Sequence, residues 1–293
     1  MVFGDQIEII EGVNDLDLNW LQSALFGLIS GLADIFPVSA QAHRVLLLKF
    51  FGVKNTTNVL AFLLHLSVFV ALYISSQGQF VRMNRARALA RVPKRKRKRP
   101  LDTRSMMDWS LVKTMLVPVI LGLFLYRYVR NLEVNLLLIA LFLFINGMIL
   151  YIPQFLPSSN RDSRTLSRVE GLLVGLGGTI SILPGISTVG AMVSIGSVCG
   201  VERVYGLNMA FIMKMFMMLG LMVYDVIGII SSGMEVLSFI LILQYLLTAL
   251  ISFAGSMIGI RVLRRLAANY GFSLFGVYCW GLALFIFILN LVV

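Results

Sequence analysis

Six apolar segments of membrane-spanning length constrain this chain more than any other feature of its sequence. They lie at about residues 57–76, 109–126, 133–153, 205–229, 236–258 and 272–293. A helix that crosses the hydrocarbon core of a bilayer needs about 20 mostly apolar residues, so each segment is long enough for one span. Because 58% of the 293 residues are hydrophobic and only 13% are charged, we expect one all-α, multi-pass integral membrane domain over residues 1–293.

The net charge of +11 is concentrated in one basic stretch, because 11 of the 25 Lys and Arg residues lie between Arg82 and Arg104. A basic stretch between two spans is typical of a cytoplasmic loop that contacts anionic lipid headgroups. No aromatic residue interleaves the basic ones, so we do not expect nucleic-acid binding. We therefore predict a cytoplasmic loop over residues 77–108, in contact with anionic lipids of the cell membrane. Counting back across the first span places residues 1–20 on the extracytoplasmic side.

Two further apolar segments, residues 21–53 and 171–200, are each interrupted near the middle by proline and small polar residues. The interruptions are similar, with Gly31 six residues before Pro37 and Gly178 six residues before Pro184. In the order of spans above, each segment must enter and leave the membrane on the same side. This predicts two re-entrant helical hairpins. Since the first enters from outside and the second from inside, we expect inverted-topology repeats with a binding site between the two interruptions.

The two interruptions favour an anionic ligand. Helices that begin just after the prolines direct free backbone N–H groups and positive dipole ends toward the site, which suits phosphate. Ser39 and Ser187 follow the prolines closely. Each serine either donates its hydroxyl to the anion or caps the helix that follows.

Lys214 is the most unusual charged residue of the spans, because it lies inside the apolar run "LNMAFIMKMFMMLGLMVYDV". A lysine there is costly unless it faces the interior of the bundle and has a partner. One interpretation makes Lys214, together with Arg44 or His43, the counter-charge of a bound phosphate. The other makes it the structural ion-pair partner of Asp34 or Asp225. For His65, in "LAFLLHLSV", we expect a hydrogen-bonded packing residue.

Two motifs resemble those of the undecaprenyl-diphosphate phosphatases, the bacitracin-resistance family. "GLISGLADIFPVSAQAHRVLL" is similar to the family pattern G-x-x-E-G-x-T-E-F-L-P-V-S-S-x-G-H, and "GLLVGLGGTISILPGISTVGAMVSIG" to G-x-x-Q-G-x-A-x-x-P-G-T-S-R-S-G-A-T. The resemblance extends from about residue 21 to the C-terminus. It implies six spans with two re-entrant hairpins and removal of a phosphate from a C55 isoprenoid diphosphate, which regenerates a lipid carrier for cell-wall synthesis. It also leaves open a divalent cation such as Mg²⁺ or Ca²⁺.

The family's first motif is only partly retained. Its first glutamate falls on Ser30, and its second falls on Asp34, which keeps a carboxylate. The first serine of the family pair is Ser39, whereas the second, the proposed nucleophile, is Ala40. The histidine that closes the motif is retained as His43.

The second motif keeps its backbone-shaping residues and loses its arginine. Pro184, Gly185 and Ser187 match the family, but Thr188 occupies the position of the arginine that clamps the phosphate. We predict no metal ligands. The candidate substrate-binding residues are Ser30, Asp34, Ser39, His43, Arg44, Gly185, Ser187, Thr188 and Lys214.

Three functions follow, because the losses fall on the chemistry and the matches fall on the scaffold. The first is binding or translocation of a polyprenyl phosphate or diphosphate, with phosphatase activity weak or lost. The second is an active undecaprenyl-diphosphate phosphatase with a rearranged site, in which Asp34, Ser39 and His43 are catalytic. The third is a non-catalytic scaffold that recruits envelope partners through the basic loop. The sequence leaves homodimer formation open.

Overall fold

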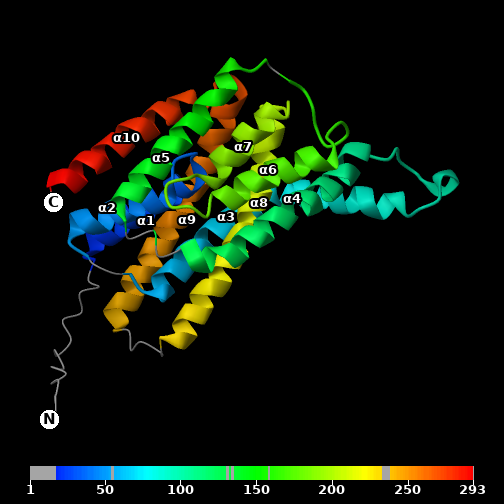
Figure 1. Ribbon diagram of the computed structural model, residues 1–293. Coiled ribbons are helices and arrows are strands. Elements are labelled where there is room, and N and C mark those ends of the chain that lie inside the picture. Colours follow the sequence, from blue (N-terminus) through cyan, green and yellow to red (C-terminus); the bar gives the residue numbers. More distant parts are fainter. Residues whose placement is uncertain are drawn as a thin grey trace, which may run out of the picture.

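The computed structural model describes residues 18–53, 56–129, 132, 135–157, 159–232 and 238–292, so the predicted extracytoplasmic segment 1–20 lies almost wholly outside the described residues. The described residues form α-helices, short 3-10 helices and connecting turns, and no β-strand occurs among them (Figure 1). The helices are α1 (Trp20–Ile35), α2 (Ala40–Phe51), α3 (Asn58–Ala90), η1 (Lys94–Lys96), α4 (Thr103–Val129), α5 (Leu136–Tyr151), η3 (Ile152–Phe155), α6 (Arg168–Ile180), α7 (Thr188–Val198), α8 (Arg203–Ser231), α9 (Phe239–Asn269) and α10 (Ser273–Val292).

Six of the described helical segments are long and apolar enough to cross a membrane: α3, α4, α5 with η3, α8, α9 and α10. They coincide with the six predicted spans. Large apolar side chains such as Phe124, Leu250 and Leu284 are 60% exposed or more. A water-soluble protein rarely exposes apolar surface on this scale, whereas lipid tails cover it at no cost. The prediction of a multi-pass, all-α membrane protein is therefore confirmed.

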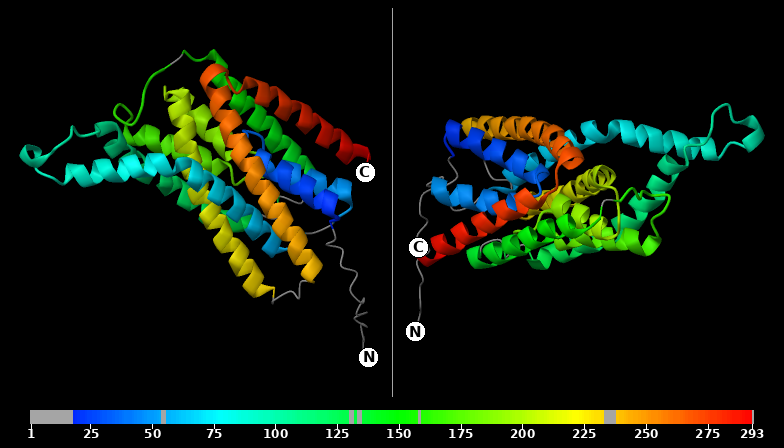
Figure 2. Two further views of the ribbon diagram at one scale, coloured as in Figure 1. Left: turned by 180° about the vertical axis from the view of Figure 1, so that it is seen from behind. Right: turned by 90° about the horizontal axis from the view of Figure 1, so that it is seen from above.

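Two of the spans continue far beyond the membrane-length core that their hydropathy defines. α3 runs on through the first part of the basic stretch to Ala90, and α4 begins again at Thr103. Only residues 91–102 of the predicted loop 77–108 therefore lie outside an α-helix. We call residues 77–108 the basic arm. Figure 2 shows that the arm extends away from the other helices in both views.

The two interrupted segments each form a pair of short helices, α1 with α2 and α6 with α7. These four helices have 11 to 16 residues, fewer than the roughly 20 that a span requires. Pro37 disfavours helical geometry in the residue before it, and α1 ends at Ile35. Ser39 and Ser187 then start the second helix of each pair as side-chain N-caps.

The short helices pack on the long ones in a regular way. α1 lies along α9, α6 lies along α4, α3 packs against α8, and α5 packs against α10. Small residues permit the closest of these approaches, as is common between helices in membranes. At Gly31 in α1, an added Cβ would overlap the carbonyl oxygen of Ser252 in α9. This packing holds the interruption after α1 at the centre of the bundle.

Candidate functional site

The two interruptions meet each other at the centre of the molecule through Ser39. Its Oγ accepts hydrogen bonds from the backbone N–H groups of Ala42, at 3.3 Å, and of Gly185, at 3.1 Å. The first bond caps α2 and the second fixes the turn between α6 and α7. Gly185 has a φ of 115°, a conformation that residues with a Cβ rarely adopt. The two interruptions are thus in direct contact in the part of the chain that the structure describes.

Asn146, on α5, makes a second connection between the interruptions. Its side-chain amide donates to the carbonyl of Pro37, at 3.2 Å, and accepts from the backbone N–H of Ser187, at 2.9 Å. Asn146 is completely buried, where unpaired polar groups are costly. The N–H and carbonyl groups of this one side chain therefore join the two turns.

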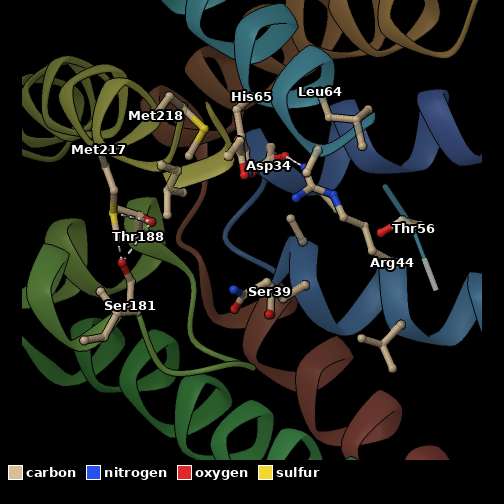
Figure 3. Close-up of a pocket in the computed structure, with 18 of the residues that line it drawn as sticks. Asp34, Ser39, Arg44, Thr56, Leu64, His65, Ser181, Thr188, Met217 and Met218 are labelled. Carbon is tan, nitrogen blue, oxygen red and sulfur yellow. Dashed lines mark hydrogen bonds and ion pairs between the residues drawn. The ribbon is translucent and has the colours of Figure 1, made fainter. Parts of the chain in front are cut away.

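A cavity of about 270 Å³ lies beside these turns, and we call it the central cavity. Its wall combines residues of both turns with residues of α3 and α8 (Figure 3). The acidic, basic and histidine residues that line it are Asp34, Arg44, His65, Lys214 and Asp225. The apolar part of the wall includes Met217, Met218 and Leu221.

Asp34 holds two cations at once in this cavity. Its Oδ1 lies 3.0 Å from Nζ of Lys214, and its Oδ2 is bonded to the guanidinium of Arg44. The side chains of Asp34, Lys214 and Arg44 are 4%, 6% and 16% exposed. With one carboxylate between two cations, the cluster has a formal charge of +1. Of the two structural partners expected for Lys214, the structure selects Asp34 and not Asp225.

Asp225 is instead paired with His65. Nδ1 of His65 lies 2.7 Å from Oδ2 of Asp225, and both side chains line the central cavity. The hydrogen bond expected for His65 is present, but the ring also lines the cavity instead of only packing between helices. The sequence analysis did not foresee that the pair faces the cavity.

Ser187 and Thr188 line the same cavity, and their hydroxyl groups already have partners. Ser187 Oγ accepts from the backbone N–H of Gly190 at 3.3 Å, which is a helix cap. Thr188 Oγ1 accepts from the hydroxyl of Ser181 at 2.9 Å. For Ser187 and for Ser39, the capping interpretation is therefore the one that the structure supports.

His43 belongs to a different part of the molecule. Its Nδ1 lies 2.7 Å from the carbonyl oxygen of Ser39, and its Nε2 lies 2.7 Å from the hydroxyl of Tyr278 on α10. The ring lines a second, mostly apolar cavity of about 470 Å³ between α1, α9 and α10. The structure thus brings Asp34 and Ser39 to the central cavity but does not bring the ring of His43 there.

Ser30 is fully buried, and its Oγ has no hydrogen-bond partner among the described residues. It does not line the central cavity. Ala40, at the position of the family's proposed nucleophile, does line it. Its methyl group has no lone pair with which to attack phosphorus.

The donor groups of the central cavity do not fit a divalent cation. Both oxygens of Asp34 are taken by Lys214 and Arg44. No group of three or more His, Cys, Asp or Glu residues suited to a metal ion occurs in the described part of the chain. Mg²⁺ and Ca²⁺ prefer carboxylate and carbonyl oxygens that are free to coordinate.

Comparison with known proteins places the chain in a family. The family described as bacitracin resistance protein BacA matches residues 23–285. The chain belongs to this family. Among its relatives, the undecaprenyl-diphosphatase of Methanobrevibacter smithii is 28% identical over 274 residues, which cover 91% of this chain and 96% of the relative. Undecaprenyl-diphosphatase 1 of Shouchella clausii is 23% identical over 278 residues, covering 92% and 96%.

Sequence reasoning missed Asn146, and it named Asp225 only as a possible partner of Lys214 and not as a residue of the site. Both carried a visible signal, because a polar side chain within an apolar span usually faces the bundle interior and has a partner. Asn146 lies in the run "LFLFINGMIL", and Asp225 lies in the span that contains Lys214.

Proposed function

We propose that this protein binds the phosphate or diphosphate headgroup of a polyprenyl lipid carrier in the central cavity, and binds or translocates the carrier without efficient hydrolysis. The observation that carries the proposal is the sharing of Asp34 by Arg44 and Lys214. A phosphate group offers more oxygen acceptors than one carboxylate. It therefore competes with Asp34 for both cations and forms charge-assisted hydrogen bonds with them.

The apolar part of the cavity wall suits the first units of an isoprenoid chain. Met217 and Met218 line the cavity on the same helix as Lys214. Methionine side chains adapt to irregular apolar ligands. The headgroup and the first units of the tail would then bind next to each other in the central cavity.

The residues at two positions argue against efficient hydrolysis. Ala40 and Thr188 stand where the family pattern has the proposed nucleophile and the phosphate-clamping arginine. Phosphoryl transfer depends on cationic stabilisation of the charge that spreads in the transition state, so a missing arginine costs several orders of magnitude in rate. Lys214 and Arg44 supply positive charge, but the carboxylate of Asp34 already neutralises part of it.

A second candidate function is hydrolysis by a rearranged site, and the names of the relatives favour it. The relatives from Methanobrevibacter smithii and Shouchella clausii are named undecaprenyl-diphosphatases. In this alternative, Asp34 and Ser39 act from the central cavity, and His43 must release Tyr278 to join them.

We also propose that the two pairs of short helices are re-entrant hairpins of two inverted repeats, α1 to α5 and α6 to α10. The packing supports this, because α1 lies along α9 as α6 lies along α4, while α3 meets its counterpart α8 and α5 meets α10. α2 leads into the end of α3 near Asn58, whereas α7 leads into the end of α8 near Tyr205, which contacts Asp108 at the start of α4. The two hairpins then enter from opposite faces.

With the basic arm in the cytoplasm, the Asn58 end of α3 lies on the extracytoplasmic side, and the central cavity opens there. Thr56, Thr57 and Asn58 line that end of the cavity. Labelling of cysteines introduced at Thr56 and at Arg95 in intact cells tests this orientation. A membrane-impermeant reagent that labels position 95 and not position 56 would reverse it.

Binding and hydrolysis are separated by two measurements on the purified protein in nanodiscs. The first is the affinity for undecaprenyl monophosphate. Lys214→Met should weaken it about tenfold or more, the loss expected for one charged hydrogen bond. Lys113→Met is the matched control, because Lys113 is an exposed lysine of another span, and it should bind like the wild type. Equal affinities for all three proteins would reject the proposal.

The second measurement is phosphate release from undecaprenyl diphosphate. We expect little or no release by the wild type and a gain in an Ala40→Ser, Thr188→Arg double variant. Release by the wild type that disappears in His43→Ala would instead establish the rearranged phosphatase.

A further inference from the structure

A third cavity, of about 620 Å³, lies at the base of the basic arm, and we call it the arm-base cavity. It is lined by residues of α3, α4, α8 and α9, including Ser75, Arg82, Arg104, Asp108, Asn208 and Arg264. Along α3, Ser75 is ten residues beyond His65, a rise of about 15 Å. Along α8, Asn208 lies six residues before Lys214, a rise of about 9 Å. Asp225 lies on the other side of Lys214 along the same helix. The arm-base cavity and the central cavity therefore lie toward opposite ends of the same two helices.

Among the described residues, no ion pair joins an arginine of the arm-base cavity to a carboxylate that lines it, although Arg82 and Arg104 act on Asp102 through space. Arg264 donates to the Asn208 side-chain oxygen and to the Ser75 carbonyl oxygen, both at 3.2 Å, and lies over the ring of Phe211. All three of these partners are neutral. A guanidinium that is partly withdrawn from water favours an anionic partner, and it presents several parallel donors to one.

The other two arginines complete a convergent set of cations. Arg104 lies over the ring of Tyr205, 4.8 Å from its centre, and pairs with Asp162, 3.4 Å away and outside the cavity lining. Arg82 forms no hydrogen bond or ion pair with a described residue, and it acts on Asp102 through space.

The two carboxylates that line the cavity are satisfied by uncharged donors. Asp108 accepts hydrogen bonds from the hydroxyl groups of Ser163, at 2.6 Å, and Tyr205, at 2.7 Å. Asp102 accepts from the backbone N–H of Ser105, at 3.0 Å, and from its hydroxyl, at 2.6 Å. Because hydroxyl and amide groups supply these contacts, neither Asp102 nor Asp108 takes a hydrogen bond from Arg82 or Arg264. An anion would compete only with the neutral partners of Arg264.

We infer that the arm-base cavity is a second phosphate-binding site, in which Arg82, Arg104 and Arg264 bind one phosphate group. Guanidinium forks match the geometry of phosphate oxygens and bind them in pairs. This site is independent of the central cavity and of the proposed function. The phosphate belongs either to the headgroup of an anionic lipid in the adjacent leaflet or to free inorganic phosphate.

Two matched pairs of variants test the site. Arg82→Gln and Arg85→Gln remove one exposed arginine each from α3, and only Arg82 lines the cavity. Arg264→Gln and Arg261→Gln each remove one arginine from α9, where Arg264 is half-buried and lines the cavity and Arg261 is exposed and does not. Because Arg82 is exposed, its variant retains the packing of the bundle even if Arg264→Gln does not.

Two probes distinguish the source of the phosphate. The first is inorganic phosphate, titrated calorimetrically into protein in nonionic detergent at constant ionic strength. The second is phosphatidylglycerol, compared with phosphatidylcholine in native mass spectrometry. For the probe that binds, Arg264→Gln should weaken binding about tenfold and Arg82→Gln severalfold, while the two controls stay within about twofold of the wild type.

Three outcomes would overturn the inference. The first is that neither probe binds the wild type, and the second is that the two controls lose as much affinity as the two cavity variants. The third is that Lys214→Met abolishes the same binding. The last outcome would place the phosphate in the central cavity. Binding that survives Lys214→Met and is lost in Arg82→Gln would establish the second site.

Discussion

The hydroxyl of Ser39 accepts a hydrogen bond from the backbone N–H of Gly185, so one side chain caps α2 and fixes the turn before α7. We expect Ser39→Ala to lower the free energy of unfolding by about 2 to 4 kcal/mol, because it removes a cap worth about 1 kcal/mol and leaves a buried N–H unpaired. Denaturation in mixed micelles measures the change. Ser39→Thr, which keeps the hydroxyl, should recover most of it.

Ser197→Ala is the control for this prediction. Its hydroxyl donates a hydrogen bond to the carbonyl of Val193 within the same helix. The free energy of unfolding should therefore fall by only about 0.5 kcal/mol. Equal losses at Ser39 and Ser197 would show that the connection between the two turns contributes nothing.

Gly185→Ala should prevent correct assembly of the two turns. The residue has a φ of 115°, and an added Cβ would lie 2.7 Å from the backbone nitrogen of Leu143 and 2.8 Å from the carbonyl oxygen of Ile139. Backbone atoms cannot move aside, so we expect a loss of folded protein after purification, measured by size-exclusion chromatography. Gly281→Ala, where nothing lies within 4 Å of the added Cβ, should yield as much folded protein as the wild type.

Asp34→Asn should be strongly destabilising because it leaves two buried cations without their carboxylate. Removing one partner of a buried ion pair typically costs about 3 to 5 kcal/mol. Lys214→Met should cost less, since Arg44 still balances Asp34. The double variant Asp34→Asn, Lys214→Met should be more stable than the sum of the single losses predicts, as a double-mutant cycle in mixed micelles would show. Simple additivity would contradict the pairing.

Glu170 gives the fold a defined response to acid. Hydrogen bonds from Arg161 and from the cap at Ser167 lower the pKa of Glu170 from 4.5 to about 2. Because the folded pKa lies below the unfolded one, this stabilisation is complete above about pH 4.5 and is lost as the pH falls toward 2. The melting temperature of Glu170→Gln should therefore lie below that of the wild type at pH 6, and the difference should shrink between pH 4.5 and 2.5. A constant difference would contradict the prediction.

The spans were predictable because a bilayer demands long apolar segments and the six segments are separated by polar ones. The helical part of the basic arm was not, since hydropathy identifies the solvent around a segment and not its backbone conformation. Lysine and arginine are good helix formers in water. α3 therefore continues past the apolar segment to Ala90.

The positions of the motif residues were predictable, but their partners were not. The sequence left Asp34 and Asp225 open as partners of Lys214, because the distance from Lys214 on α8 to Asp34 on α1 depends on how all the helices pack together. The same limit applies to His43, which sits four residues after Ser39 on one helix. Its ring has turned toward Tyr278, a residue 235 positions away.

α3 extends without interruption from the central cavity into the basic arm. This helix has 33 residues and no proline, so it is a stiff rod of about 50 Å. His65 lies near one end, basic residues lie near the other, and α8 packs against it between them. His65 of the central cavity and Arg82 of the arm-base cavity are 17 residues apart on this helix, a rise of about 25 Å. One unbroken helix therefore forms part of the wall of both cavities.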